Sequence, residues 1–401
     1  MGRIIHTGDT HIGYLQYHLP SRQSDFLNAF KRVVQDAIDG DFDAIVHSGD
    51  LFDKINPDLK DIAGTIEILQ LAKGKVPILA IAGNHEMRRG GIQWIDLFDR
   101  LGLVKHLDES PYIIKDQEGD IAIYGMDYVH QDKREELDYQ FEDSQSKYKI
   151  LVSHGQFTPL VLVPGRNAWD LEMVLESSNI KFDVVLLGDE HGQKQKMIGD
   201  VWATYCGSTE RASIKERERR SYNIIDLKDG INISTRNIQT REFVYIEEEI
   251  TEQDGIGYLY DRIKEEEHKF VDAVVIITVE NKGRKIPISE IEEYCKQRGA
   301  IYVQIKSKVG EEGETRVGEW VSFEDPSEAI ESGIEALGLT DISRQIDLIV
   351  RDQNILDSNL KIHVKELIEE FRNGMKGLEE PGVEDNDKNG KSEEYTLGDF
   401  S

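Results

Sequence analysis

The chain has 401 residues, of which 39% are hydrophobic and 31% are charged. This composition is sufficient for a packed core and excludes wholesale disorder. With 48 basic and 77 acidic residues, the formal net charge is −29, which opposes nucleic-acid binding unless a bound metal or a local basic strip overrides it. An acidic surface is also typical of proteins from a salt-rich cytosol, where screening shortens the repulsion. We favour this second interpretation, so the charge neither supports nor excludes a nucleic-acid substrate.

We expect neither a signal peptide nor a membrane span in this sequence. No stretch approaches the roughly 20 apolar residues that a membrane span needs, and residues 1–7 run into strand-like sequence instead of a signal peptide. The two cysteines, Cys206 and Cys295, lie far apart, which excludes a disulfide scaffold and a cysteine-rich metal site. We therefore expect a cytoplasmic protein with no membrane partner.

The first 190 residues alternate short apolar runs with amphipathic stretches, a pattern typical of a layered α/β domain. Strands are expected at 3–7, 43–47, 77–82, 121–125, 149–153 and 183–187. Apolar residues at helical spacing predict a helix after the first strand, and these residues are Phe26, Phe30, Val33, Val34 and Ala37. Two further helices are expected at 61–71 and 92–101. From 201 to 249 the pattern alternates, which predicts a second sheet that closes the same domain.

The remaining sequence divides into a small αβαβ unit, a linker, a helical segment and a tail. The unit has helices expected at 257–267 and 288–297 and strands at 271–279 and 300–305. A helix start is expected at 325–328, where an aspartate cap, a proline and a glutamate stand in order. We expect a main domain over 1–250, a small αβ domain over 251–309, a linker over 310–324, a helical segment over 325–373 and a disordered acidic tail over 374–401.

Five of the expected strands end in a glycine beside aspartate, asparagine or histidine. The endings are Gly8-Asp9-Thr10-His11, Gly49-Asp50-Leu51-Phe52-Asp53, Gly83-Asn84-His85-Glu86, His154-Gly155 and Gly188-Asp189-Glu190-His191. Open α/β sheets place their sites at the carboxyl edge of the strands. Glycine permits a tight turn there, and oxygen and imidazole donors bind divalent metals. A capped turn beside a buried histidine explains one such ending, whereas five in strand register predict a metal site.

These endings resemble the signature of the calcineurin-like metallophosphoesterases. Longer stretches at 7–13, 49–52 and 205–211 are similar to one branch, the archaeal nuclease subunit of the Mre–Rad DNA double-strand-break repair complex. Specific motifs carry the resemblance over roughly the first 250 residues, and architecture alone carries it beyond them. The resemblance implies a two-sheet layered α/β domain flanked by helices, with a small αβ DNA-capping domain and C-terminal helices.

The resemblance also implies two Mn²⁺ ions in each subunit. One would be surrounded by Asp9, His11, Asp50 and His191, and the other by Asp50, Asn84, His154 and Asp189. Two metals about 4 Å apart clamp both apical oxygens of an in-line phosphoryl displacement, so no protein nucleophile is needed. His85 follows a ligand, and we expect it to stabilise the phosphorane and to protonate the leaving ribose oxygen. The alternative role for His85 is that of a structural histidine behind the ligands.

Two positions depart from the family pattern. The family reads Gly-His-x-His in the fifth loop, where this chain has Asp189. Residues 189 and 191 face the same way in an extended segment, so Asp189 rather than Glu190 is expected to replace the missing histidine. The family often has histidine where Asp53 stands, and that histidine supports exonuclease action. The Asp53 departure therefore bears on exonuclease activity more than on metal binding.

The partners that the resemblance implies are DNA, an SMC-like ATPase and a second copy of the chain. The coiled coil of the ATPase would dock on an apolar stripe of the helical segment, at Leu360, Val364, Leu367 and Phe371. The helices expected at 61–71 and 92–101 carry an apolar set, Ile62, Ile66, Leu69, Trp94, Leu97 and Phe98. Part of this set would form a four-helix bundle with a second copy in a twofold dimer. The alternative for this set is burial in the core. Leu397 and Phe400 resemble a peptide that binds the sliding clamp, and the alternative is an inert solubilising tail.

The leading hypothesis is therefore a Mn²⁺-dependent DNA nuclease, with single-strand endonuclease and 3′–5′ exonuclease activities, that processes double-strand breaks with its ATPase partner. A second hypothesis is a phosphatase or phosphodiesterase for small substrates. The residues beyond the main domain argue against it, because a small substrate needs no capping unit or partner helices. A third hypothesis is a scaffold that binds DNA ends and has feeble nuclease activity because Asp189 weakens the site. Cleavage of DNA in Mn²⁺ distinguishes the first hypothesis from the third.

Overall fold

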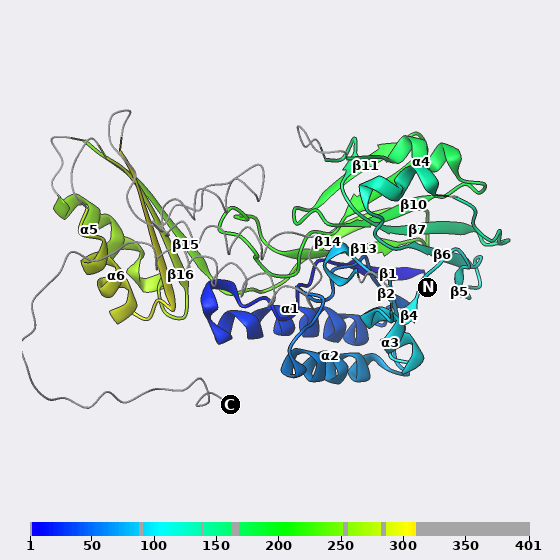
Figure 1. The fold of residues 1–401 in the computed structure, drawn as a ribbon, viewed down its shortest axis with the longest axis horizontal. Coiled ribbons are helices and arrows are strands. Elements are labelled where there is room, and N and C mark those ends of the chain that lie inside the picture. The colour runs from blue at the N-terminus through cyan, green and yellow to red at the C-terminus, as the bar shows by residue number, and fades with distance from the viewer. Residues whose placement is uncertain are drawn as a thin grey trace, which may run out of the picture. The chain divides into compact units, whose positions relative to one another are not determined.

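The computed structural model describes residues 2–87, 91–137, 139–161, 168–251, 256–281 and 286–309 (Figure 1). The predicted linker, helical segment and tail lie outside the described residues. The same holds for the residues predicted to bind the ATPase and the sliding clamp, which are Leu360, Val364, Leu367, Phe371, Leu397 and Phe400. Within the described ranges, no helix is long and apolar enough to cross a membrane.

Two six-stranded sheets form the main part of the fold (Figure 1). The first has the order β14-β13-β1-β2-β3-β4, with β14 (Asn232–Asn237), β13 (Ser221–Asp226), β1 (Arg3–Thr7), β2 (Ala44–His47), β3 (Ile78–Ala80) and β4 (Lys105–His106). The second has the order β11-β12-β10-β7-β6-β5, with β11 (Lys194–Ile198), β12 (Val201–Tyr205), β10 (Val184–Gly188), β7 (Tyr148–His154), β6 (Ile121–Met126) and β5 (Tyr112–Ile114). A short pair, β8 (Phe157–Thr158) and β9 (Trp169–Asp170), stands apart. All six strands expected in the first 190 residues are present.

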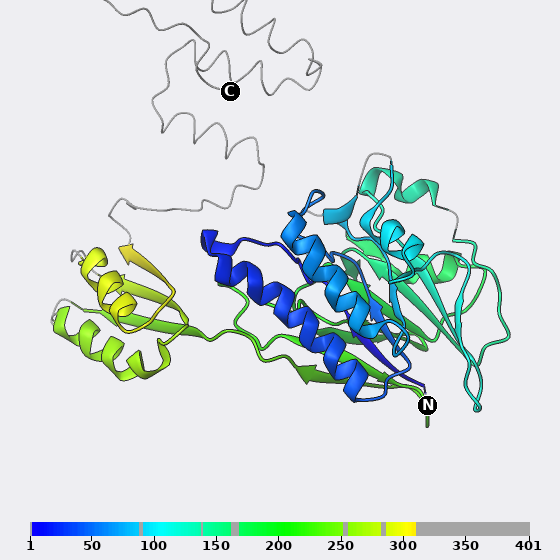
Figure 2. The ribbon, with the colours of Figure 1, turned by 90° about the horizontal axis from the view of Figure 1, so that it is seen from below.

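Helices cover the outer faces of both sheets and complete a layered α/β fold, as the sequence predicts. They are α1 (Pro20–Asp39), α2 (Leu59–Ala72) and α3 (Trp94–Arg100) on the first sheet and α4 (Leu171–Ser177) on the second. Figure 2 shows α1 and α2 side by side across the first sheet. A further cluster of apolar side chains fills the space between the two sheets, and it includes Ile4, Val46, Ile150 and Val184. Central strands buried on both faces explain why these segments are continuous apolar runs.

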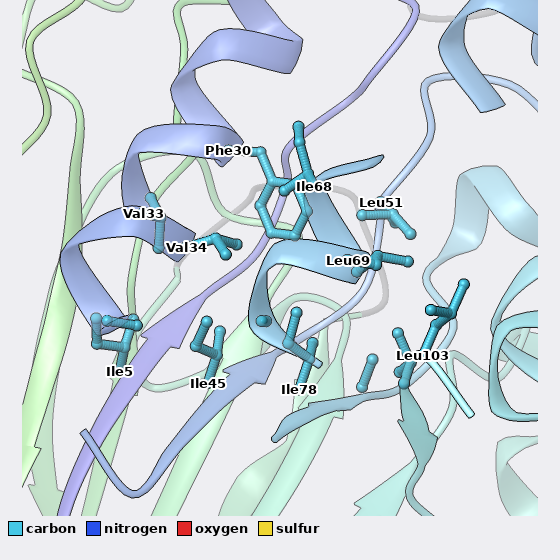
Figure 3. Packing of buried hydrophobic residues seen from close by; sticks show 14 of the residues in the cluster. Ile5, Phe30, Val33, Val34, Ile45, Leu51, Ile68, Leu69, Ile78 and Leu103 are labelled. Atoms are coloured by element: carbon cyan, nitrogen blue, oxygen red, sulfur yellow. The ribbon is translucent and has the colours of Figure 1, made fainter. Parts of the chain in front are cut away.

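The apolar stripe of α1 packs as its helical spacing predicts. Phe30, Val33 and Val34 are fully buried against the first sheet. Figure 3 shows these side chains over the strand residues Ile5, Ile45 and Ile78. Ile68 and Leu69 of α2 lie over the same strands. β1, β2 and β3 pair in parallel, so their carboxyl ends lie at one edge of the sheet.

The prediction that residues 201–249 form a second sheet that closes the main domain is wrong. The strands of this stretch enter three different sheets: β12 joins the second sheet, β13 and β14 extend the first, and β15 (Phe243–Ile250) starts a third. Alternation of apolar and polar residues shows that a strand has one covered face, but it does not indicate which strand lies beside it.

The third sheet belongs to the small αβ unit. Its order is β15-β16-β17, with β16 (Val274–Asn281) and β17 (Tyr302–Val309), and all pairs are parallel. The helices α5 (Ile256–Glu266) and α6 (Ile288–Gln297) connect the strands and share their apolar core. The unit is thus βαβαβ and begins one strand earlier than the predicted αβαβ unit, because β15 supplies its first strand.

A charged histidine joins α3 to the second sheet. His106, at the end of β4, lies 2.9 Å from carboxylate oxygens of both Asp96 on α3 and Asp127 after β6. Burial opposes the charge of the imidazole, but the hydrogen bonds and ion pairs with Asp127 and Asp96 outweigh it and raise the pKa of His106 from 6.5 to about 9. The stabilisation is therefore fully present below the unfolded pKa of about 6.5 and is lost as pH rises through 9.

We expect His106→Gln to lower the free energy of unfolding by at most about 3 kcal/mol near pH 6, because each pKa unit corresponds to about 1.4 kcal/mol. The difference from the unchanged protein should shrink at about pH 9.5 and above, where His106 is neutral in both states. Urea unfolding of both proteins at the two pH values measures it. An equal difference at both pH values would show that the charge of His106 contributes nothing.

Candidate metal centre

The predicted ligands are carried by loops that follow five parallel-paired strands, β1, β2, β3, β7 and β10. Four of these residues have a left-handed backbone, with φ of 48° at Asp9, 42° at His11, 55° at Asp50 and 93° at Asp189. Such values are uncommon for residues other than glycine, and they concentrate at functional sites. The backbone is therefore turned sharply at the positions whose side chains the site uses.

The glycines beside these residues allow the loops to approach each other closely. Gly49 has φ of +97°, and a Cβ there would overlap the ring of His154. A Cβ on Gly188 would overlap the carbonyl oxygen of Ser48, which is the same oxygen that accepts a hydrogen bond from Nδ1 of His154 at 2.7 Å. Both glycines are thus required by backbone approach rather than by turn geometry alone.

Two compact groups of donor atoms lie at this edge. Asp9, His11 and His191 form one, and Asp9, Asp50 and His154 form the other, with the ligand atoms of each group within 4.8 Å of one another. Oδ2 of Asp50 lies 3.5 Å from Nε2 of His154 and 4.0 Å from Nε2 of His11. Asp9 therefore belongs to both groups, and Asp50 belongs to the second group and borders the first.

The two other predicted ligands border the second group. Oδ1 of Asn84 lies 2.8 Å from Nε2 of His154, and Oδ1 of Asp189 lies 3.9 Å from the same nitrogen. The backbone N–H of Asp189 also donates to Oδ1 of Asp9 at 3.0 Å. The structure thus brings all seven predicted ligands together, with Asp189 at the edge of the cluster and outside the compact groups.

The donor set and its burial fit divalent cations. Asp9 and Asp50 are 0% and 2% exposed, and burial raises the pKa of Asp9 to about 7 although His154 and His191 oppose the rise. Burial alone would also raise the pKa of Asp50, but His154 outweighs it and holds that pKa well below its ordinary value. Buried carboxylates and imidazoles need compensating charge, and in His11 burial lowers the pKa to about 3, which leaves a neutral metal-binding ring.

His85 lies at the rim of the site. Its Nδ1 donates to the carbonyl oxygen of Asp53 at 2.5 Å, and its Nε2 lies 4.0 Å from Oδ2 of Asp50. The side chain is 38% exposed, whereas Asp50 beside it is buried. The hydrogen bond of Nδ1 orients the ring so that Nε2 faces Asp50 and the site.

Sequence reasoning missed three features of this centre. His11, Asp53 and His85 form a third compact group of donor atoms, and the Asp53 departure was the only sign of it. Glu86 is buried and accepts from the backbone N–H groups of Phe52 and Gly83, so it ties the second loop to the third. Glu216 accepts from Nδ1 of His191 at 2.8 Å, and nothing in its sequence position indicates this contact.

Comparison with known proteins agrees with the geometry. Residues 2–193 match the calcineurin-like phosphoesterase family. A DNA double-strand break repair protein Mre11 from Halobacterium salinarum is 43% identical over 370 residues, which are 91% of this chain and 93% of the relative. The protein of the same name from Haloferax volcanii is 41% identical over 371 residues, 92% of this chain and 82% of the relative. Since this likeness extends far beyond residue 193, the family predicted from the strand endings is confirmed, and the chain belongs to the Mre11 family of DNA double-strand break repair proteins, a branch of the calcineurin-like phosphoesterases.

Proposed function

We propose that this hydrolase is a Mn²⁺-dependent DNA nuclease that cuts single strands and trims double-stranded ends from 3′ to 5′. The convergence of seven oxygen and imidazole donors from five loops carries the proposal, in a chain whose relatives are named for double-strand break repair. We place its action in the cytoplasm with an SMC-like ATPase, which would bind the segment with Leu360, Val364, Leu367 and Phe371. The sliding clamp is a further proposed partner, through Leu397 and Phe400.

The ligand sets follow the positions of the donors. Asp9, His11 and His191 would hold one Mn²⁺ ion, and Asn84, His154 and Asp189 the other, with Asp50 between them. When bound, two such ions stabilise the attacking and leaving oxygens of an in-line displacement at phosphorus. A reaction at two such ions needs no nucleophile from the protein.

His85 has the position of a general acid. Its Nε2 faces the centre on a ring that the carbonyl of Asp53 orients, and its partial exposure gives access to DNA. We infer that a proton at Nε2 is transferred to the leaving ribose oxygen as the P–O bond breaks. The structural alternative, an orienting histidine, is tested by the leaving-group experiment described in the Discussion.

The assignment of Asp189 as a ligand is tested against its neighbour. Oε2 of Glu190 lies 3.1 Å from Nζ of Lys194, and its Oε1 accepts from the backbone of Gly192 at 3.1 Å, so Glu190 is engaged elsewhere. We expect Asp189→Ala to weaken Mn²⁺ binding at one of two sites by at least about tenfold, since even partners behind the ligands typically contribute that much. Calorimetric titration of the metal-free proteins measures it, with Glu190→Ala as the matched control. Equal Mn²⁺ affinity in Asp189→Ala and the unchanged protein would remove Asp189 from the ligand set.

We also propose a homodimer, and the burial of the predicted apolar set shows which of its residues could form the interface. Leu69 and Phe98 are buried in the core, while Ile62, Ile66 and Trp94 pack only partly against it. Large apolar side chains nearby are exposed, with Leu59 at 84%, Ile92 at 45% and Ile55 at 40%. We propose that these exposed side chains, near the starts of α2 and α3, form part of the interface with a second copy of the chain.

We expect Leu59→Glu to convert the dimer into a monomer and so to halve the mass measured by light scattering. Leu59 is the first residue of α2, where a carboxylate favours the helix, so the change spares the fold. Val271→Glu is the control, because Val271 is 74% exposed in the small αβ unit. A dimer that persists in Leu59→Glu, or a monomer before any change, would exclude this surface.

One assay distinguishes the nuclease from the two alternative functions, a scaffold that binds DNA ends and an enzyme for small substrates. Metal-stripped protein is given Mn²⁺ and labelled single-stranded, hairpin or duplex DNA, and in parallel a p-nitrophenyl phosphodiester. Cleavage of DNA is the expected result. Binding of DNA ends without cleavage would favour the scaffold, and hydrolysis of the p-nitrophenyl ester alone would favour an enzyme for small substrates.

A further inference from the structure

The segment after β12 encloses His191 on two sides. The backbone carbonyl of His191 accepts from the N–H of Ser208 at 3.1 Å and from Nη1 of Arg220 at 2.9 Å. Its ring donates from Nδ1 to Oε1 of Glu216 at 2.8 Å. Both the main chain and the imidazole of this one residue are therefore held by 208–220, which includes the end of the 205–211 motif.

Glu216 is itself fixed by its second carboxylate oxygen. Oε2 accepts from the backbone N–H of Ala212 at 2.9 Å and from Nη1 of Arg220 at 3.4 Å. The carbonyl oxygen of Glu216 accepts from Nε of Arg211 at 3.1 Å. The side chain is 15% exposed, so solvent does not readily replace these bonds. The carboxylate is thus presented to His191 in one orientation.

A carboxylate in this position changes how an imidazole binds a metal. When Nδ1 donates to Glu216, the proton of the neutral ring is kept on that nitrogen, and Nε2 presents its lone pair. The bond also fixes the plane of the ring and raises the basicity of Nε2. In this structure Nε2 of His191 faces Nε2 of His11 at 3.1 Å, inside the group that His191 forms with Asp9 and His11.

The loop that carries Glu216 is fastened to the small αβ unit. The hydroxyl of Tyr245 on β15 donates to the carbonyl oxygen of Ile214 at 3.1 Å, and Ile214 packs against a cluster that contains Phe243. Arg217 also forms a two-bond ion pair with Glu247 on the same strand. Strand β15 thus contacts the loop on both sides of Lys215–Glu216.

We propose that Glu216 is a positioning residue for the metal ligand His191 and that strand β15 keeps Glu216 in place through its contacts with 214–217. The inference rests on the proposed metal centre. It adds that the small αβ unit influences metal binding through the contacts of β15 with the loop that carries Glu216. Glu216 touches His191 and not the reacting atoms, so its effect should show first in metal affinity. Tyr245 acts one step further away and should have a smaller effect of the same sign.

The test is a calorimetric titration of Mn²⁺ into the metal-free full chain and its variants. We expect Glu216→Ala to weaken one of two Mn²⁺ sites by about 10- to 100-fold. Glu216→Gln should recover only a small part of this loss, because its single amide oxygen can accept from Nδ1 only when its NH2 group faces the donors of Ala212 and Arg220. Tyr245→Phe, which removes one neutral hydrogen bond, should weaken the same site by up to about fivefold. Glu218→Ala is the control, since the exposed Glu218 lies on the same loop and makes no bond to His191 through its side chain.

The outcomes separate this inference from the proposed function. Absence of Mn²⁺ binding by the unchanged chain would contradict the metal centre itself. Two sites with unchanged affinity in Glu216→Ala would overturn the role of Glu216 and leave the centre intact. Glu216→Gln as weak as Glu216→Ala, with the thermal unfolding of the metal-free variants unaltered, would show that the hydrogen bond to Nδ1 is not the cause. Unchanged affinity in Tyr245→Phe would show that the hydrogen bond from Tyr245 to Ile214 does not help to hold Glu216 in place.

Discussion

Asp50→Asn is expected to lower the rate of Mn²⁺-dependent DNA cleavage by about 10³-fold or more. Oδ2 of Asp50 lies between the two ligand groups, 3.5 Å from Nε2 of His154 and 4.0 Å from Nε2 of His11. The amide is of similar size but carries no charge, so neither cation is held or compensated as before. Two-metal stabilisation of the transition state is worth several kcal/mol, and every 1.4 kcal/mol or so corresponds to tenfold in rate. Single-turnover cleavage of a labelled single strand measures the loss.

The matched control for Asp50→Asn is Asp43→Asn, because Asp43 lies before β2 whereas Asp50 lies in the loop after β2. Asp43 precedes β2, and its Oδ2 accepts from the backbone N–H groups of Gly2 and Arg3 at 2.7 and 2.8 Å. Asp43→Asn should cleave DNA at nearly the normal rate. Cleavage within tenfold of normal by Asp50→Asn would contradict the position of Asp50 between two catalytic cations.

His85→Gln is expected to lower DNA cleavage by about 10²- to 10⁴-fold, the usual contribution of a general acid, without loss of Mn²⁺ affinity. The leaving ribose oxygen is a poor leaving group and needs a proton, whereas p-nitrophenolate leaves without one. The same variant should therefore hydrolyse a p-nitrophenyl ester of thymidine monophosphate at close to the normal rate. Comparison of the two substrates with one variant measures the proton transfer separately from metal binding.

Two results would overturn the role of His85. Equal losses on both substrates would indicate that His85 orients the site and does not transfer a proton. Weaker Mn²⁺ binding in His85→Gln would indicate that the group His11, Asp53 and His85 holds a cation. Asp53→Asn distinguishes these cases, because it should weaken Mn²⁺ binding only if that third group is occupied.

The part of the fold that carries the ligands was predictable because its signals are local. A parallel strand buried on both faces is a continuous apolar run, and the tight turn at its end requires glycine beside the donor residue. β1, β2, β3, β7 and β10 all show both features, and parallel pairing then brings their ends together. The layered α/β fold, predicted from the alternation of apolar and amphipathic stretches, is confirmed. The family, predicted from these endings and from the stretches at 7–13, 49–52 and 205–211, is also confirmed.

The features that sequence missed depend on contacts between distant segments. β15 could be assigned to a sheet only by its pairing with β16, and its alternating pattern fits any sheet with one covered face. Glu216 stands in a run of charged residues, 215–220, in which every side chain fits a solvated loop. Its contact with His191 arises because Arg220 and Ala212 turn the carboxylate inward. Likewise, helical spacing could not separate Leu69 and Phe98, which face the core, from Ile62 and Ile66 beside them.

Anomalous diffraction at the manganese absorption edge, from crystals grown with Mn²⁺, tests the two-metal centre most directly. We predict two peaks in each chain, about 4 Å apart. One should be bound by Asp9, His11 and His191 and the other by Asn84, His154 and Asp189, with Asp50 contacting both. A single peak, or a peak held by His11, Asp53 and His85 in place of either, would contradict the two-metal assignment.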